Sequence, residues 1–191
     1  MFRPVRVTPS ADLDLPISVE DVKTALRVDG DDTDGEIERL IKAAVQHYEG
    51  WSGVLGIAIV EQTWRQDYGR FEEKMGLKVG PVTSIASVKY RNDQGQIATV
   101  AADKYALKHT GGGEAYVRFD RGFTAPVDLY EDAPISIEYV AGWPIGEVPA
   151  DIQTAIILRV QKHFDAAAQT NSDVLDRVEK DLTSRYLTLS I

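Results

Sequence analysis

Residues 17–53 read ISVEDVKTALRVDGDDTDGEIERLIKAAVQHYEGWSG and specify two consecutive helices joined by an acidic turn. In the first helix, the Ser18 hydroxyl can accept the amide of Asp21, and acidic residues favour the positive end of the helix dipole. In the second helix, Thr33 and Glu36 match the capping-box pattern. Each predicted helix therefore has its own start signal.

Apolar residues recur in both segments at helical spacing. They are Val19, Val22, Ala25 and Leu26 in the first helix, and Ile37, Leu40, Ile41, Ala44, Val45 and Tyr48 in the second. We expect Asp29-Gly30 to end the first helix. With Gly50 and Gly53 as stop signals, the second has about 18 residues and a length of roughly 27 Å. Stripes of this kind have to pack against further apolar surface, so the pair predicts a helical core.

The composition excludes several classes of protein. The chain has 191 residues, no Cys and a formal net charge of −9. The absence of Cys excludes a disulfide framework and a thiolate metal site. The acidic balance repels phosphate backbones and argues against tight DNA binding. No apolar run reaches the ~18 residues of a membrane span, and the start lacks a signal peptide, so we expect a soluble cytoplasmic product.

The middle of the chain changes to a β pattern, rich in Val, Ile, Thr and aromatic residues with partial alternation. The predicted strands cover residues 58–68, 76–79, 83–91, 96–100, 103–110, 114–120 and 134–143. Turns at residues 92–95 and 111–113 predict two hairpins, and residues 121–134 an irregular loop. Strands in series with short turns indicate an antiparallel sheet.

A helical pattern returns after Pro144, with Pro149 near the first turn. Its apolar stripe consists of Ile152, Ala155, Ile156, Val160 and Phe164. Ser172 could cap a fourth, more polar helix, in which one face carries Leu175, Val178, Leu182 and Tyr186.

These elements predict an α+β fold, in which a small helical bundle carries an inserted antiparallel β-rich domain. The bundle combines two N-terminal helices with C-terminal helices. We expect an extended N-terminal arm at 1–16 that orders against a partner, the bundle at 17–56 and 144–186, the β-rich domain at 57–143 and a C-terminal tail at 187–191.

No catalytic, metal or cofactor site is predicted. The acidic turn at 29–35 departs from the EF-hand template, because Leu40 stands where a bidentate Glu is required. The glycines at 111–113 lack the Lys and Ser/Thr of a phosphate loop. His47, His109 and His163 are scattered without metal-ligand spacing.

In the order and wording of these segments, the chain resembles the head-tail connector (adaptor) family of tailed bacteriophages and related gene transfer agents. The resemblance covers residues 17–165. It is carried by the helical stretch SVEDVKTALRVDGDDTDGEIERLIKAAVQHYEGWSG, then EQTWRQ, VGPVTSIASVKYRNDQGQ and YVAGWPIGEVPADIQTAIILRVQKHF.

The resemblance implies a non-enzymatic virion protein of a phage, prophage or gene transfer agent, without cofactors and without a membrane role. Its copies, typically twelve, form a ring between the capsid portal and the tail, and DNA passes through without specific binding. The implied partners are the portal protein and a tail-side stopper or tail terminator. The implied location is the head-tail junction of a particle assembled in the bacterial cytoplasm.

The resemblance also implies roles for particular residues. The bundle core would consist of Val22, Leu26, Ile37, Leu40, Ile41, Val45, Ile152, Ile156 and Val160. The portal-contact candidates are Tyr186, Leu187, Leu189 and Ile191. The last three alternate with polar residues in a tail that could add an edge strand to a partner.

Two alternatives remain open from the residues alone. One is an α+β ligand-binding or enzymatic domain with a site between sheet and helices, in which Trp64, Tyr90 or Trp143 serves as a platform. The other is an acidic regulator that mimics DNA.

Overall fold

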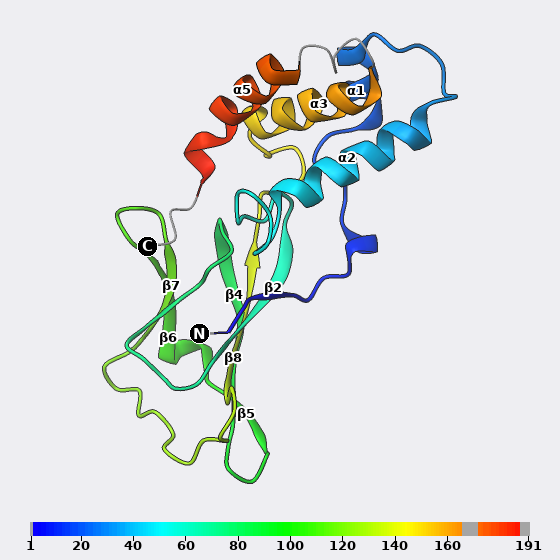
Figure 1. Ribbon diagram of the computed structural model, residues 1–191. Coiled ribbons are helices and arrows are strands. Elements are labelled where there is room, and N and C mark those ends of the chain that lie inside the picture. Colours follow the sequence, from blue (N-terminus) through cyan, green and yellow to red (C-terminus); the bar gives the residue numbers. More distant parts are fainter. Residues whose placement is uncertain (1, 166–171, 188–191) are drawn as a thin grey trace. The chain divides into compact units, whose positions relative to one another are not determined.

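The computed structural model describes residues 2–165 and 172–187, which form two compact units (Figure 1). The β unit comprises Met1–Leu13 and Glu61–Gly142, and the helical unit comprises Asp14–Val60 and Trp143–Ile191. Helices and antiparallel sheets together confirm the predicted α+β class. No helix among the described residues is both long and apolar enough to cross a membrane.

A five-stranded antiparallel sheet organises the β unit. Its order is β1 (Val5–Arg6), β2 (Gln62–Tyr68), β8 (Ile135–Ala141), β4 (Val82–Arg91) and β5 (Ile97–Thr99). The side chains of Ile135, Ile137 and Tyr139 on β8 are fully buried, as alternation along this strand predicts. The N-terminal arm was expected to order against a partner protein. Instead, its strand β1 pairs with β2 of the same chain.

A second sheet of the β unit has three antiparallel strands. Its order is β3 (Lys74–Gly76), β7 (Ala115–Phe119) and β6 (Tyr105–His109), with a short 3-10 helix, Ala102–Lys104, before β6. Both predicted hairpins are present, β4 with β5 and β6 with β7. Gly95 and Gly113 take positive φ in their turns, a conformation open to glycine without a Cβ penalty.

The helical unit contains α1 (Val19–Leu26), α2 (Asp34–Tyr48), α3 (Ala150–Phe164) and α5 (Ser172–Thr183), followed by a 3-10 turn, Ser184–Tyr186. The helix α3 packs against α1, α2 and α5. The fully buried side chains in these contacts are Val22, Ile37, Ile41, Ala44, Ile152, Ala155, Ile156 and Val160. Early and late segments of the chain therefore share one core, as their apolar stripes predict.

The ends of α1 and α2 agree with one expectation and differ from three. Ser18 caps α1 as predicted, accepting the amide of Asp21 at 3.0 Å. However, α1 ends at Leu26, where Arg27 adopts the left-handed conformation, so Asp29-Gly30 lies beyond it. The Thr33 side chain makes no capping hydrogen bond, and α2 has 15 residues rather than about 18.

Several residues that were predicted on the buried faces of the helices are more exposed than expected. Leu26, Leu40 and Val45, all expected in the bundle core, are only half-buried. On α5, the expected apolar residue Val178 is 43% exposed. The residues of α5 that are buried are Glu179 and Thr183.

Candidate functional site

The best-defined polar arrangement in the helical unit surrounds a buried carboxylate on α5. Glu179 is 7% exposed. Its Oε1 accepts a 2.5 Å hydrogen bond from the hydroxyl of Tyr48 on α2 and a 3.0 Å hydrogen bond from Nη1 of Arg159 on α3. One oxygen atom thus receives a neutral and a charged donor from two different helices. The carboxylate ties α5 to both of its neighbours, and we call these three residues the α5 junction.

The electrostatics of the α5 junction favour one cation and one anion. Burial, reinforced by the hydrogen bond to Glu179, raises the pKa of Tyr48, so the phenol stays protonated. The ring of His47 lies 5.1 Å from that of Tyr48. Burial, together with the charge of Arg159, lowers the pKa of His47. Arg159 is consequently the cation that balances Glu179.

The role of Glu179 was not predicted from the sequence, because apolar residues were expected on the buried face of α5. A signal was available, since Arg159 stands inside an apolar stretch of α3 and requires a nearby anion when it is covered. Nothing in the sequence says which of the many acidic residues supplies that anion.

The acidic turn between α1 and α2 binds a lysine side chain of the same unit. The Lys23 side chain is 6% exposed, and its ammonium lies 2.8 Å from Asp34 and 3.1 Å from Asp31. Hydrogen bonds to these two carboxylates raise the pKa of Lys23. The carboxylates therefore hold an ammonium of the same chain. Among the described residues, no group of three or more His, Asp or Glu side chains is placed to hold a metal ion.

The end of the described chain folds onto its own unit. The Tyr186 ring contacts that of Trp143 edge-on, with centroids 6.0 Å apart. Arg185 lies over the Tyr186 ring and forms an ion pair with Asp151 at the start of α3. Of the four portal-contact candidates, Tyr186 is half-buried, Leu187 is 43% exposed, and Leu189 and Ile191 lie outside the described residues.

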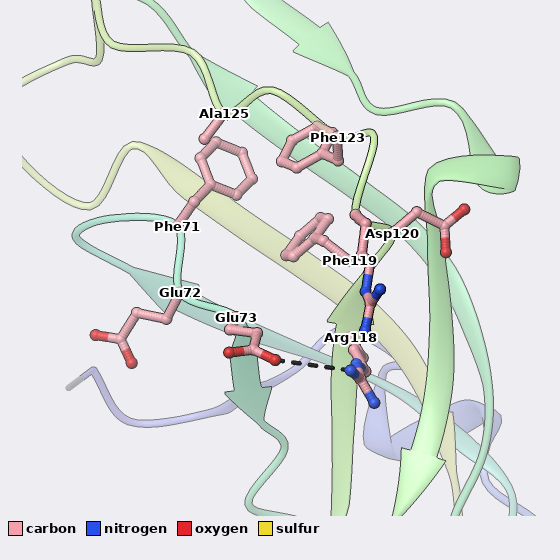
Figure 2. A pocket seen from close by; sticks show the side chains of 9 residues that line it. Phe71, Glu72, Glu73, Arg118, Phe119, Asp120, Phe123 and Ala125 are labelled. Atoms are coloured by element: carbon pink, nitrogen blue, oxygen red, sulfur yellow. Dashed lines mark ion pairs between the residues drawn. The ribbon is translucent and has the colours of Figure 1, made fainter.

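The β unit has an open hollow of about 440 Å³, which Figure 2 shows from close by. Its floor is aromatic: Phe119 and Phe123 stack at 4.6 Å, and Phe71 meets both rings edge-on. Its rim is charged, and Arg118 pairs with Glu73 at 3.7 Å. The lining residues include Glu72, Glu73 and Asp120 but no His, Ser, Thr or Lys, so the hollow contains no hydroxyl or amine nucleophile with an imidazole base beside it.

The three candidate platform aromatics pack as structural residues. Trp64 is 5% exposed in β2, and the Tyr90 ring lies edge-on to Phe71 at 6.1 Å. Trp143 belongs to the helical unit, where Tyr186 covers one side of it. None of the three lines the hollow of the β unit.

Comparisons with known proteins identify the family of the chain. The sequence profile of the family described as Head completion protein matches residues 16–175. No curated protein matches the chain.

Solved structures share the fold. One chain of "Neck of empty GTA particle computed with C6 symmetry" is 18% identical with a TM-score of 0.76, covering 100% of this chain and 97% of that one. A chain of "Neck of native GTA particle computed with C12 symmetry" has 18% identity, a TM-score of 0.71 and the same coverage. A chain of "Virion of native gene transfer agent (GTA) particle" has 18% identity and a TM-score of 0.64, covering 85% of this chain and 84% of that one.

Proposed function

Because this chain belongs to the head completion protein family, whose members are structural proteins and not enzymes, we propose that it connects head and tail as an oligomeric ring at the neck of a phage or gene transfer agent particle. The family match confirms the resemblance to head-tail connectors and the non-enzymatic role. The family match itself, which spans both units of the chain, is the observation that carries the proposal.

Further observations support the ring and its position. Two of the three chains with the same fold come from structures of particle necks, one computed with C6 and one with C12 symmetry. A ring of twelve copies is compatible with both symmetries. We infer that the ring lies between the portal protein and a tail-side stopper or tail terminator. DNA would pass through its centre without specific binding, as an acidic chain of net charge −9 favours.

The portal contact is assigned to the C-terminal segment. Leu187 is 43% exposed, and apolar residues alternate with polar ones from there to Ile191. Such a segment can add a strand to a partner's sheet and bury one row of side chains. Removing residues 187–191 should therefore weaken portal binding in a pull-down and leave the melting temperature unchanged. Full retention of the portal by the shortened chain would remove the tail from this contact.

The connector role is tested by making particles without this chain. The expected products are filled heads and separate complete tails, and addition of the purified protein should restore their joining. Electron microscopy of the two preparations measures the joined fraction. Normal joining in the absence of the chain would contradict the proposal.

A further inference from the structure

The outward face of the three-stranded sheet is basic, although the chain as a whole is acidic. Alternation buries Met75, Leu77 and Val117 and turns Lys74, Lys78 and Arg118 outward. In the register of the sheet, Lys74 and Ala106 are both opposite Arg118, and Lys108 is opposite Tyr116. Lys74, Lys108 and Arg118 therefore lie around Tyr116, and Lys78 follows two residues after β3. We call Lys74, Lys78, Lys108, Arg118 and Tyr116 the basic face.

Little negative charge of the same unit neutralises the basic face. The Lys74 ammonium lies 5.5 Å from the centre of the Tyr116 ring, a cation–π contact. Arg118 pairs with Glu73 at 3.7 Å. Within residues 2–165 and 172–187, Lys78 and Lys108 have no ion pair. The face thus presents several cations to a partner of opposite charge.

The negative charge of the chain is concentrated in the other unit. The helical unit contains 17 acidic and 9 basic residues, a net charge of −8, whereas the β unit has a net charge of −1. The turn between α1 and α2 contains three carboxylates, Asp29, Asp31 and Asp32, and the first turn of α2 adds Asp34 and Glu36. Of these five, Asp31 and Asp34 pair with the ammonium of Lys23. Asp29 and Asp32 in this turn are exposed and form no ion pair with any described residue.

We infer that the basic face of one copy docks on the acidic α1–α2 turn of a second copy. The inference rests on the proposed ring, because head-to-tail contacts between two different surfaces of identical chains are the contacts that close a ring. Opposite charges on the two surfaces steer the encounter and set the register. Like-charge contacts, face on face or turn on turn, are disfavoured by the same charges.

A second copy fits the face better than DNA does. The phosphate charge of a duplex runs on beyond the four cations and there meets the acidic remainder of the chain, whereas the acidic turn ends within a few residues. The acidic turn brings carboxylates on a short, compact segment that a face of four cations can cover. Binding of a duplex in place of the second copy is one outcome of the experiment.

Because the chain has no Cys, disulfide trapping can detect the contact with a low background. Ala106→Cys places a thiol on the basic face and keeps all four cations, since Ala106 is opposite Arg118. Gly35→Cys places a thiol beside the acidic turn, where an added Cβ meets no atom within 4 Å. Ser184→Cys, exposed in the 3-10 turn that follows α5, is the matched control for Gly35→Cys.

Mixing full-length Ala106→Cys and Gly35→Cys chains under mild oxidation should give a mixed disulfide dimer about tenfold above the Ser184→Cys control. The yield should fall when the salt concentration rises from about 0.1 M to about 1 M, because the screening length shrinks from about 10 Å to about 3 Å. A yield equal to the control, or one insensitive to salt, would overturn the inference.

Charge reversal then identifies the residues. Lys74→Glu with Lys108→Glu in the Ala106→Cys chain should lower the yield about tenfold, and so should Asp29→Lys with Asp32→Lys in the Gly35→Cys chain. Mixing the two charge-reversed chains should restore the disulfide yield, because a double-mutant cycle across a direct contact recovers the lost interaction. Arg3→Glu with Arg70→Glu makes the same charge change elsewhere on the β unit and should have no effect.

Each remaining outcome decides the question. The inference is overturned if mixing the two charge-reversed chains does not restore the disulfide yield. It is also overturned if a DNA duplex binds the native basic face while the disulfide yield stays at the level of the Ser184→Cys control. Particles that still join heads to tails with Lys74→Glu and Lys108→Glu would overturn this contact and leave the connector role standing.

Discussion

The hydroxyl of Tyr48, the last residue of α2, donates a 2.5 Å hydrogen bond to Glu179 of α5, which lies 131 positions later in the chain. Arg159 of α3 donates to the same oxygen at 3.0 Å. The two bonds join three helices at one buried carboxylate. Otherwise α5 buries only one further residue, Thr183, so its docking depends strongly on this junction.

Removing the carboxylate should destabilise the helical unit. Glu179→Ala leaves the guanidinium of Arg159 largely buried and without a carboxylate to pair with. This change should lower the free energy of unfolding by about 3–5 kcal/mol. Tyr48→Phe removes one hydrogen bond to the charged group and should cost about 1.5–3 kcal/mol. The exposed Asp181→Asn on the same helix is the control, expected within about 0.5 kcal/mol of the native chain. Urea unfolding measures all three, and equal stability of Glu179→Ala and the control would contradict the junction.

Acid should weaken the helical unit through His47. Burial lowers the pKa of His47 in the folded state below its ordinary value of 6.5. Below pH 6.5 the unfolded chain therefore binds a proton more readily than the folded chain, and stability falls as the pH drops from 6.5 toward the folded pKa. His47→Gln should flatten this part of the stability profile. An unchanged slope between pH 7 and about pH 5 in the variant would show that His47 is not the responsible group.

Neighbouring positions on α2 should respond very differently to the same substitution. The Ile41 side chain is 0% exposed, so Ile41→Asp introduces an unpaired charge into the core and should abolish folding, at a cost of several kcal/mol. Leu40 is half-buried, and Leu40→Asp should cost about 1 kcal/mol. Circular dichroism and urea unfolding distinguish the two variants. Similar losses would mean that the buried face of α2 is wrongly assigned.

The loop after α2 should tolerate no side chain at Gly53. A Cβ at this position meets the carbonyl oxygen of Glu49 and lies 2.5 Å from that of Tyr48, both of them backbone atoms. Gly53→Ala should therefore destabilise by about 1–3 kcal/mol through overpacking. Gly35→Ala, in the first turn of α2 with open space around it, should instead stabilise by about 0.4–1 kcal/mol. Thermal melting gives the sign of each change, and a neutral Gly53→Ala would contradict the close approach.

The sequence predicted the elements that depend on periodicity. The alternation of Ile135, Ile137 and Tyr139 identified one buried row of β8, and the Ser18 cap identified the start of α1. Such features are local, because each depends on residues a few positions apart. Hairpins followed from turn residues for the same reason.

Features that depend on residues far apart could not be predicted. Asp31 and Asp34 gave a pattern typical of turns and caps, and only the fold brings the Lys23 ammonium between them. The basic face assembles from three strands between residues 74 and 118, and their register cannot be derived from composition. The N-terminal strand was missed because two residues are too few for a periodicity, and pairing with β2 decides their conformation.

The connector role is tested most directly by cryo-electron microscopy of the neck in purified particles that carry a small tag on this chain. We expect tag density in a closed ring of copies at the head-tail junction, with an open channel along its axis. Particles that join head to tail without this chain in the neck, or a chain found there as a single copy, would contradict it.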